Sequence, residues 1–246
     1  MFVDVHCHLD DRKFTNLYSV IKNATSKDVK IIISNGLNHE SNVKNLEISK
    51  KYSIVKPAFG IYPEDAIKLN EDGLQDEIKF INNNRNNIIA IGEVGLDGTI
   101  DSMLKQKEAF LEMIKLGEKL KLPLIVHSRK AEQDVVDLLE SSNVKKAVMH
   151  CFTGNLKLAK KIEDNNWKFS IPLIIKRSSN FKKLVEITSI SNLLTETDSP
   201  YLNINKEINQ PCNVVEIAKE ISLIKNLDFD ETKNLIFMNY QKLFNR

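Results

Sequence analysis

Two histidines stand two residues apart near the start of the chain, in the stretch VDVHCHLD at residues 3–10. Alternate residues of a β-strand point to the same side, so His6 and His8 can project together from the end of one strand. Imidazole nitrogens bind Zn, Mn, Fe or Co, and with carboxylates and water the same kind of site suits Mg. The pair alone is a weak signal, because a buried histidine is more often a satisfied core residue.

Further ligand-type residues follow other apolar runs of the chain. Glu93 lies in IGEVGLD, His127 in LIVHSR, His150 in AVMHCF and Asp198 in LLTETDSP, whereas the fifth histidine, His39, stands at an expected helix start. With the first pair these make six ligand-type groups, which is more than one structural ion needs. They suit two divalent ions roughly 3.5–4 Å apart, which activate water and clamp a transferring oxygen.

The apolar runs that carry these residues recur along the whole chain. Eight of them predict strands: FVDVHCH, KIIISNG, IVKPAFGIYP, NIIAIGEVGL, LPLIVHS, KAVMHCF, WKFSIP and NLLTETDSP. Helical periodicity lies between them, most clearly at 103–122 and also at 131–140, 155–163, 181–187 and 214–223. Two closing helices are expected at 211–225 and 230–244, the second with Asp230 as its N-cap.

Strands that alternate with helices predict parallel βαβ units. Eight such units in roughly 200 residues predict an α/β fold, a single (β/α)8 TIM barrel that forms one domain over residues 1–246. The alternative is an open doubly wound sheet, but GxGxxG, its usual phosphate-binding sequence, is absent after the first strand. In a barrel the chemistry lies at the carboxyl ends of the strands, so the six ligand-type groups should converge there.

The same alternation of side chains makes predictions for the neighbours of the ligand-type residues. Cys7 and Cys151 should point outward to the helices. Asp4 should face the same side as the first histidine, either supporting an imidazole or pairing with a polar group of the core. Asp97 should either support a ligand or cap its loop. Trp167, in a strand, is expected in the core.

Composition restricts the class of protein. The net charge of +2 with 28% charged residues gives no strongly basic surface for nucleic acid, although it leaves room for a local basic groove. No apolar stretch approaches the roughly 18 residues of a membrane span, and the first residues do not read as a signal peptide. Three cysteines without CxxC spacing favour reduced thiols. We therefore expect a cytoplasmic chain, with no membrane association and no feature that predicts an obligate protein partner.

Five motifs together resemble a known family. VDVHCHLD, IGEVGLD, LPLIVHSRKAEQD, MHCFTG and TETDSPYL are similar, in order and spacing, to the TatD-type metal-dependent deoxyribonucleases of the amidohydrolase superfamily. The resemblance implies a (β/α)8 barrel that hydrolyses DNA phosphodiesters with two divalent metal ions (Mg, Mn or Zn). It implies two ligand sets, His6, His8, Glu93 and Asp198 for the first ion and Glu93, His127 and His150 for the second, with Glu93 bridging them. Asp198 would also accept the proton of the attacking water.

Two further residues are predicted to contact the substrate. Arg129 follows a ligand-type histidine and can donate two hydrogen bonds to a phosphate in bidentate fashion, unless it forms a structural ion pair at the barrel mouth. The third strand ends in GIYP where the family usually has GxHP. Tyr62 therefore replaces a histidine, and we expect its hydroxyl or ring to contact a nucleotide rather than a metal. The alternative is that the ring packs against Pro63 and the loop.

Two other positions depart from the family, Gly98 after the fourth strand and Gln210 after the eighth, and they too leave the identity of the substrate undecided.

Three functions are compatible with these residues. The first is a DNase that acts on DNA ends by a metal-activated water. The second is an ester or amide hydrolase on the same two-metal site, such as a D-aminoacyl-tRNA deacylase. The third, a non-catalytic binding module, would be expected to have lost ligand residues. The lysine-bearing segments 157–161 and 176–183 could track a DNA backbone or simply form solvated helix faces.

Overall fold

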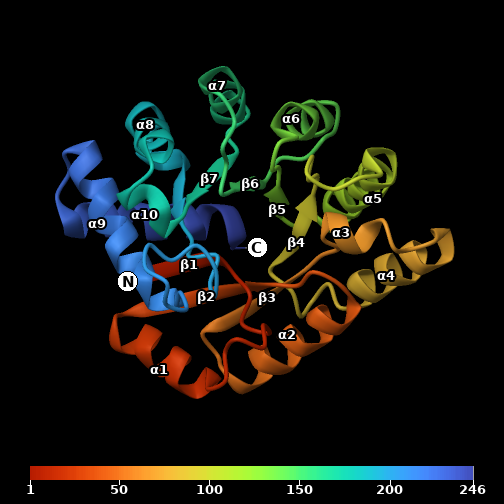
Figure 1. The fold of residues 1–246 in the computed structure, drawn as a ribbon, viewed down its shortest axis with the longest axis horizontal. Helices are drawn as coiled ribbons and strands as arrows, with labels where there is room; N and C mark the ends of the chain where they lie inside the picture. The colour runs from red at the N-terminus through yellow and green to blue at the C-terminus, as the bar shows by residue number, and fades with distance from the viewer. Residues whose placement is uncertain (246) are drawn as a thin grey trace.

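Eight parallel strands lie side by side in chain order and curve into a nearly closed barrel (Figure 1). The computed structural model describes residues 1–245. Within them the strands are β1 (Phe2–Cys7), β2 (Val29–Asn35), β3 (Val55–Phe59), β4 (Ala90–Gly95), β5 (Leu124–His127), β6 (Ala147–His150), β7 (Lys168–Ile171) and β8 (Leu193–Thr195). Seven lie within the predicted apolar runs and β2 begins one residue before its run, so the predicted (β/α)8 barrel is confirmed.

Helices follow the strands and lie around the outside of the barrel (Figure 1). They are α1 (Leu17–Ser26), α2 (His39–Lys51), α3 (Pro63–Ala66), α4 (Glu71–Asn83), α5 (Met103–Leu120), α6 (Glu132–Glu140), α7 (Leu156–Asp164), α8 (Ser179–Ile187), α9 (Val214–Lys225) and α10 (Phe229–Phe244). Short 3-10 turns are η1 (Leu173–Lys176), η2 (Ile190–Asn192) and η3 (Pro211–Asn213). No helix within residues 1–245 is long and apolar enough to cross a membrane.

The apolar face of each helix packs on the strands. In α5, Phe110, Met113 and Ile114 are at most 2% exposed, as the helical periodicity predicts. A Cβ on Gly117 would lie 2.7 Å from Cδ2 of Leu124, so this glycine lets α5 approach β5 closely. Trp167 is also in the core, as predicted: it is 2% exposed and its indole N–H donates to the carbonyl of residue 144.

The first and last strands close the barrel. The hydroxyl of Thr195 donates to the carbonyl of Val3 over 2.5 Å. Beyond the end of β8, the amide of Asp198 donates to the carbonyl of His6 (2.9 Å), and the amide of His8 donates to the carbonyl of residue 199 (2.7 Å). These bonds fix His6, in β1, and His8, just after it, next to the ligand-type aspartate that follows β8.

Helix α10 packs against the opposite end of β8. The side-chain amide of Asn239 donates to the carbonyls of Ile190 (2.7 Å) and Leu193 (2.9 Å). Its N-cap corrects the sequence prediction: Asp228, not Asp230, accepts from the amides of residues 230 (2.8 Å) and 231 (3.0 Å). Asp230 lies in the first turn, where its carboxylate contacts Lys233.

We expect Asp228→Ala to lower the free energy of unfolding by about 1 kcal/mol, because the substitution removes the acceptor for two amides at the start of α10. Asp230→Ala is the matched control, and it should cost less because it removes only a solvent-exposed ion pair. Urea unfolding followed by circular dichroism measures both. Equal losses in the two variants would contradict this assignment of the N-cap.

Candidate metal centre

Glu93 lies at the centre of a buried cluster at the carboxyl ends of the strands. Its side chain is 3% exposed and comes from β4. One carboxylate oxygen, Oε2, lies 3.4 Å from Nε2 of His6 and 3.5 Å from Nε2 of His8. The other, Oε1, lies 2.9 Å from Nδ1 of His127 and 3.4 Å from Nε2 of His150. Each oxygen of one carboxylate therefore faces its own pair of imidazoles.

The spacing of these atoms fits divalent metal ions. Nε2 of His6 and Nε2 of His8 are 3.2 Å apart, and an ion about 2.0–2.2 Å from each donor would hold neighbouring donors roughly 3–3.5 Å apart. Three groups of ligand atoms each lie within 4.8 Å of one another: His6, His8 and Glu93; Glu93, His127 and His150; and His6, His150 and Glu196. The first two groups bring together residues that the resemblance assigned to the two ions, whereas the third contains Glu196, which was not predicted.

A close approach of backbone keeps Glu93 in place. A Cβ on Gly60, just after β3, would lie 2.3 Å from the carbonyl oxygen of Glu93 and 2.6 Å from its nitrogen. Glycine is the residue that allows the chain after β3 to lie directly against this part of β4.

Asp198 completes the cluster from the loop after β8. Its Oδ1 lies 3.4 Å from Nε2 of His6 and 3.3 Å from Nε2 of His8. Its φ of +53° is a left-handed conformation that aspartate tolerates better than most residues. The chain before it is anchored by Asp4, which accepts from the hydroxyl (2.5 Å) and the amide (2.9 Å) of Thr197. Of the two roles open to Asp4, pairing with a polar group of the core is therefore the one observed.

The outer nitrogens of three imidazoles are also engaged. Nδ1 of His8 donates to the carbonyl of Asn35 (3.0 Å), and Nε2 of His127 lies 3.1 Å from Asp97. Asp97 also accepts from the amide and hydroxyl of Thr99, so it combines the two predicted roles. A ring nitrogen that donates outward leaves the inner nitrogen with its lone pair toward the cluster, as a metal ligand requires.

Glu196 is the partner of the third of these imidazoles, His150, and it was not predicted from the sequence. Its Oε2 lies 3.2 Å from Nδ1 of His150 and accepts from the hydroxyl of Ser170 over 2.5 Å, while Oε1 accepts from the amide of Cys151 (2.9 Å). Glu196 is fully buried. The sequence did contain a signal, because TETD places Glu196 two residues before Asp198, the same spacing that first singled out the histidine pair.

The charges of the cluster shift the pKa of its members. Burial would raise the pKa of Glu93, but the surrounding imidazoles, His6 and His150 foremost, hold it well below its ordinary value. Burial would lower the pKa of His150, yet the carboxylates of Glu196 and Glu93 raise it well above the usual range. Metal ions and protons therefore compete for the same imidazole nitrogens.

A cavity of about 730 Å³ opens over the cluster. Tyr62 and Arg129, the two residues predicted to contact substrate, both line it. The hydroxyl of Tyr62 lies 3.3 Å from Asp97 and 3.4 Å from Nε2 of His127, and its ring meets that imidazole edge-on with centroids 5.0 Å apart. Arg129 forms no ion pair with any residue of the described chain, so its guanidinium is not held by a carboxylate at the barrel mouth.

The two cysteines that were expected to point outward differ in their surroundings. Cys7 is buried and its thiol donates to the carbonyl of residue 33. The predicted outward orientation is wrong for Cys151, which borders the cavity. Strand β6 ends at residue 150, and the φ of +44° at Cys151 removes it from strand alternation.

In the lysine-bearing segments, Lys160, Lys161 and Lys176 pair with carboxylates, which favours solvated helix faces over a surface that tracks DNA.

Comparisons with known proteins agree with this geometry. The family model described as TatD related DNase matches residues 3–245. An uncharacterized metal-dependent hydrolase of Methanocaldococcus jannaschii is 35% identical over 100% of this chain and 97% of its own. Deoxyribonuclease TATDN3 of Homo sapiens is 31% identical over 98% of this chain and 94% of its own. The crystal structure of a TatD homologue from Escherichia coli superposes with a TM-score of 0.93 at 24% identity, covering 100% of this chain and 98% of that one.

A parallel barrel with imidazoles and carboxylates converging at the carboxyl ends of its strands is the architecture of a metal-dependent hydrolase. The comparisons narrow the class further. The chain belongs to the TatD family.

We expect Glu196→Gln to weaken metal binding about 10–100-fold, because the neutral amide holds the imidazole of His150 less firmly than a carboxylate does. The change in metal affinity is measured by titrating each variant with metal and recording its melting temperature (Tm) at each metal concentration. The matched control is Glu132→Gln, a surface carboxylate whose contact is the hydroxyl of residue 153. If both variants bind metal as the parent does, Glu196 has no influence on the cluster.

Proposed function

We propose that two divalent metal ions bind in this cluster, with Glu93 bridging them. The proposal is carried by one observation, that each oxygen of Glu93 faces a different pair of imidazoles. His6 and His8, with Asp198, would hold one ion, and His127 and His150 the other. Such a pair of ions supplies Lewis-acid chemistry, activating water near neutral pH and neutralising charge on phosphoryl oxygens.

Asp198 is the group that we assign to proton transfer. Its side chain is 16% exposed, against 3% for Glu93, and it borders the cavity. The neighbouring imidazoles of His6 and His8, acting against the effect of burial, hold its pKa below the ordinary value, so it is ionised and able to accept a proton at neutral pH. The carboxylate would take the proton from the attacking water and pass it to solvent through the open mouth.

We propose a phosphodiester of DNA, at a strand end, as the substrate. The name of the family model and that of the human relative support a nuclease. Arg129 provides a guanidinium at the mouth that forms no ion pair within residues 1–245, where negative charge builds up on a phosphodiester in the transition state. The cavity of about 730 Å³ is in the range that encloses a small ligand, which suits a terminal nucleotide better than the middle of a duplex.

The test is hydrolysis by the metal-loaded protein of single- and double-stranded DNA, labelled separately at the 5′ and 3′ ends. We expect products that shorten stepwise from one end. A parallel reaction with D-aminoacyl-tRNA examines the ester-hydrolase alternative. Release of the amino acid with DNA left intact would overturn the proposed substrate. Internal cuts in circular DNA would overturn the preference for ends.

Asp198→Asn should lower kcat about 10²–10⁴-fold with metal saturating, because an amide keeps the shape of the side chain but cannot accept the proton. Single-turnover hydrolysis at several metal concentrations separates this loss from weaker metal binding. Turnover within about threefold of the parent would remove Asp198 from the role of general base.

Tyr62 is proposed to contact the nucleotide through its ring. Tyr62→Phe should change KM little, since the hydroxyl already lies against Asp97 and His127. Tyr62→Ala should weaken binding of a short oligonucleotide by about 1–3 kcal/mol, because it removes the stacking face. KM for both variants, with folding checked by Tm, is the measurement. An unchanged KM in Tyr62→Ala would mean that the ring only packs against His127 and does not contact the nucleotide.

A further inference from the structure

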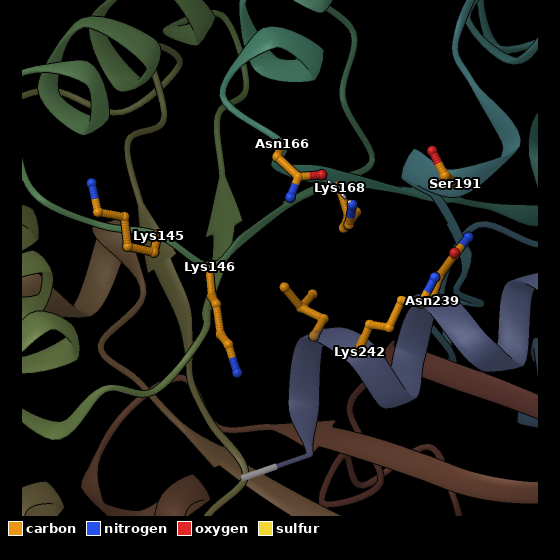
Figure 2. Close-up of a pocket in the computed structure, with 8 residues that line it drawn as sticks. Lys145, Lys146, Asn166, Lys168, Ser191, Asn239 and Lys242 are labelled. Atoms are coloured by element: carbon orange, nitrogen blue, oxygen red, sulfur yellow. Dashed lines mark hydrogen bonds between the residues drawn. The ribbon is translucent and has the colours of Figure 1, made fainter.

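A second cavity, of about 400 Å³, lies at the amino ends of the last strands, opposite the hydrolytic mouth. We call it the lysine cavity. Its lining is Lys145, Lys146, Asn166, Lys168, Ser191, Asn239, Lys242 and Leu243. Figure 2 shows these side chains coming from separate elements around one opening, the segment before β6, the start of β7, η2 and α10.

The charge of the lysine cavity is of one sign. Four of its eight lining residues are lysines and none is an aspartate or glutamate. Lys145 extends away from the others in Figure 2, which leaves Lys146, Lys168 and Lys242 around the space. None of these three forms an ion pair with a residue in the described part of the chain, although lysines on the helices commonly do.

Lys168 is the residue that sets this cavity apart from an ordinary basic surface. It is 8% exposed, and its ammonium group donates to the side-chain oxygen of Asn166 over 2.8 Å. A lysine this buried is rare unless an anion compensates its charge. Burial, and then repulsion from Lys242, lower its pKa below the ordinary value. The fold therefore holds a cation in a cationic cavity with no carboxylate among its lining residues.

We propose that the lysine cavity binds a phosphate group, either inorganic phosphate or the phosphate of a small phosphorylated molecule, through Lys146, Lys168 and Lys242. Three ammonium groups call for a multiply charged anion, and lysine acts on phosphate as a compact point charge with several donors. Asn166 and Ser191 add a polar rim, and Leu243 provides an apolar wall. The volume falls within the range of small-molecule sites.

The shape and place of the cavity favour a small ligand over nucleic acid. A backbone-tracking surface is a groove or stripe of positive charge along which a strand can lie, whereas here the lysines line one cavity between β7 and α10. Lys146 and His150 lie at opposite ends of β6, four residues or about 13 Å apart. The site is thus separate from the hydrolytic mouth and does not depend on the proposed nuclease activity.

Lysine acetylation footprinting of the metal-loaded protein locates binding residue by residue. Inorganic phosphate at about ten times its Kd should slow labelling of Lys146 and Lys242 about tenfold. Lys182, an exposed lysine of α8, should be unaffected, as should all three lysines in chloride at the same ionic strength. Adenosine monophosphate and a single-stranded oligonucleotide are the further arms. Protection by phosphate or by the nucleotide supports the proposal and identifies the source of the phosphate group. Protection by the oligonucleotide alone, or none, overturns it.

Variants provide a second readout. Lys242 occupies an exposed position of α10. Lys242→Gln should weaken phosphate binding, measured by calorimetry, about tenfold or more. Lys182→Gln is the matched control and should leave phosphate binding unchanged. Without phosphate, Lys168→Met should have a Tm equal to or above that of the parent, because the substitution removes an uncompensated buried charge. A lower Tm would show that Lys168 serves only to hold Asn166. Unchanged affinity in Lys242→Gln would also overturn the site.

Discussion

The buried carboxylate of Glu93, with one pair of imidazoles on each of its oxygens, is the constraint around which the barrel mouth is built. An ionised carboxylate this far from water is stable only with compensating charge close by. Strands β1, β5 and β6 supply that compensation, and each has to end at the height of β4 for the nitrogens to reach 2.9–3.5 Å. Asn35, Asp97 and Glu196 contact the outer ring nitrogens of three of these histidines and so fix the orientation of the rings. Removing any ring support would loosen a nitrogen that compensates the central charge.

The fold and the inner ligands could be predicted from the sequence because both follow from local rules. Apolar runs with β-branched residues mark the strands, and strand alternation carries His6 and His8 to one side. Parallel strands bring their carboxyl ends to one edge, so Glu93, His127 and His150 had to meet once the barrel was assumed. The structure places all six predicted ligand-type groups in a single cluster.

What could not be predicted depends on contacts between distant segments or on backbone angles that local rules do not fix. Glu196 has its role only because β7 and β8 bring Ser170 and the end of β6 beside it. Cys151 departs from alternation because the strand has already ended. The N-cap of α10 is Asp228 and not the predicted Asp230, because the backbone amides at the start of the helix reach the carboxylate of Asp228. The periodicity of apolar residues identifies the strands and helices. The side chains that meet across the barrel can be identified only when the register between its strands is known.

The closure between β1 and β8 also sets the order in which the molecule can become a hydrolase. Thr195 bonds Val3 across 192 positions of sequence, and Asp198 bonds the backbone of His6 just beyond. During synthesis on the ribosome, His6 and His8 emerge early. Asp198, the carboxylate that lies beside them, is synthesised only after the last strand. Such long-range pairing is slow to form and comes late in folding. A nascent chain therefore carries only part of the metal cluster until nearly all of the barrel has been translated.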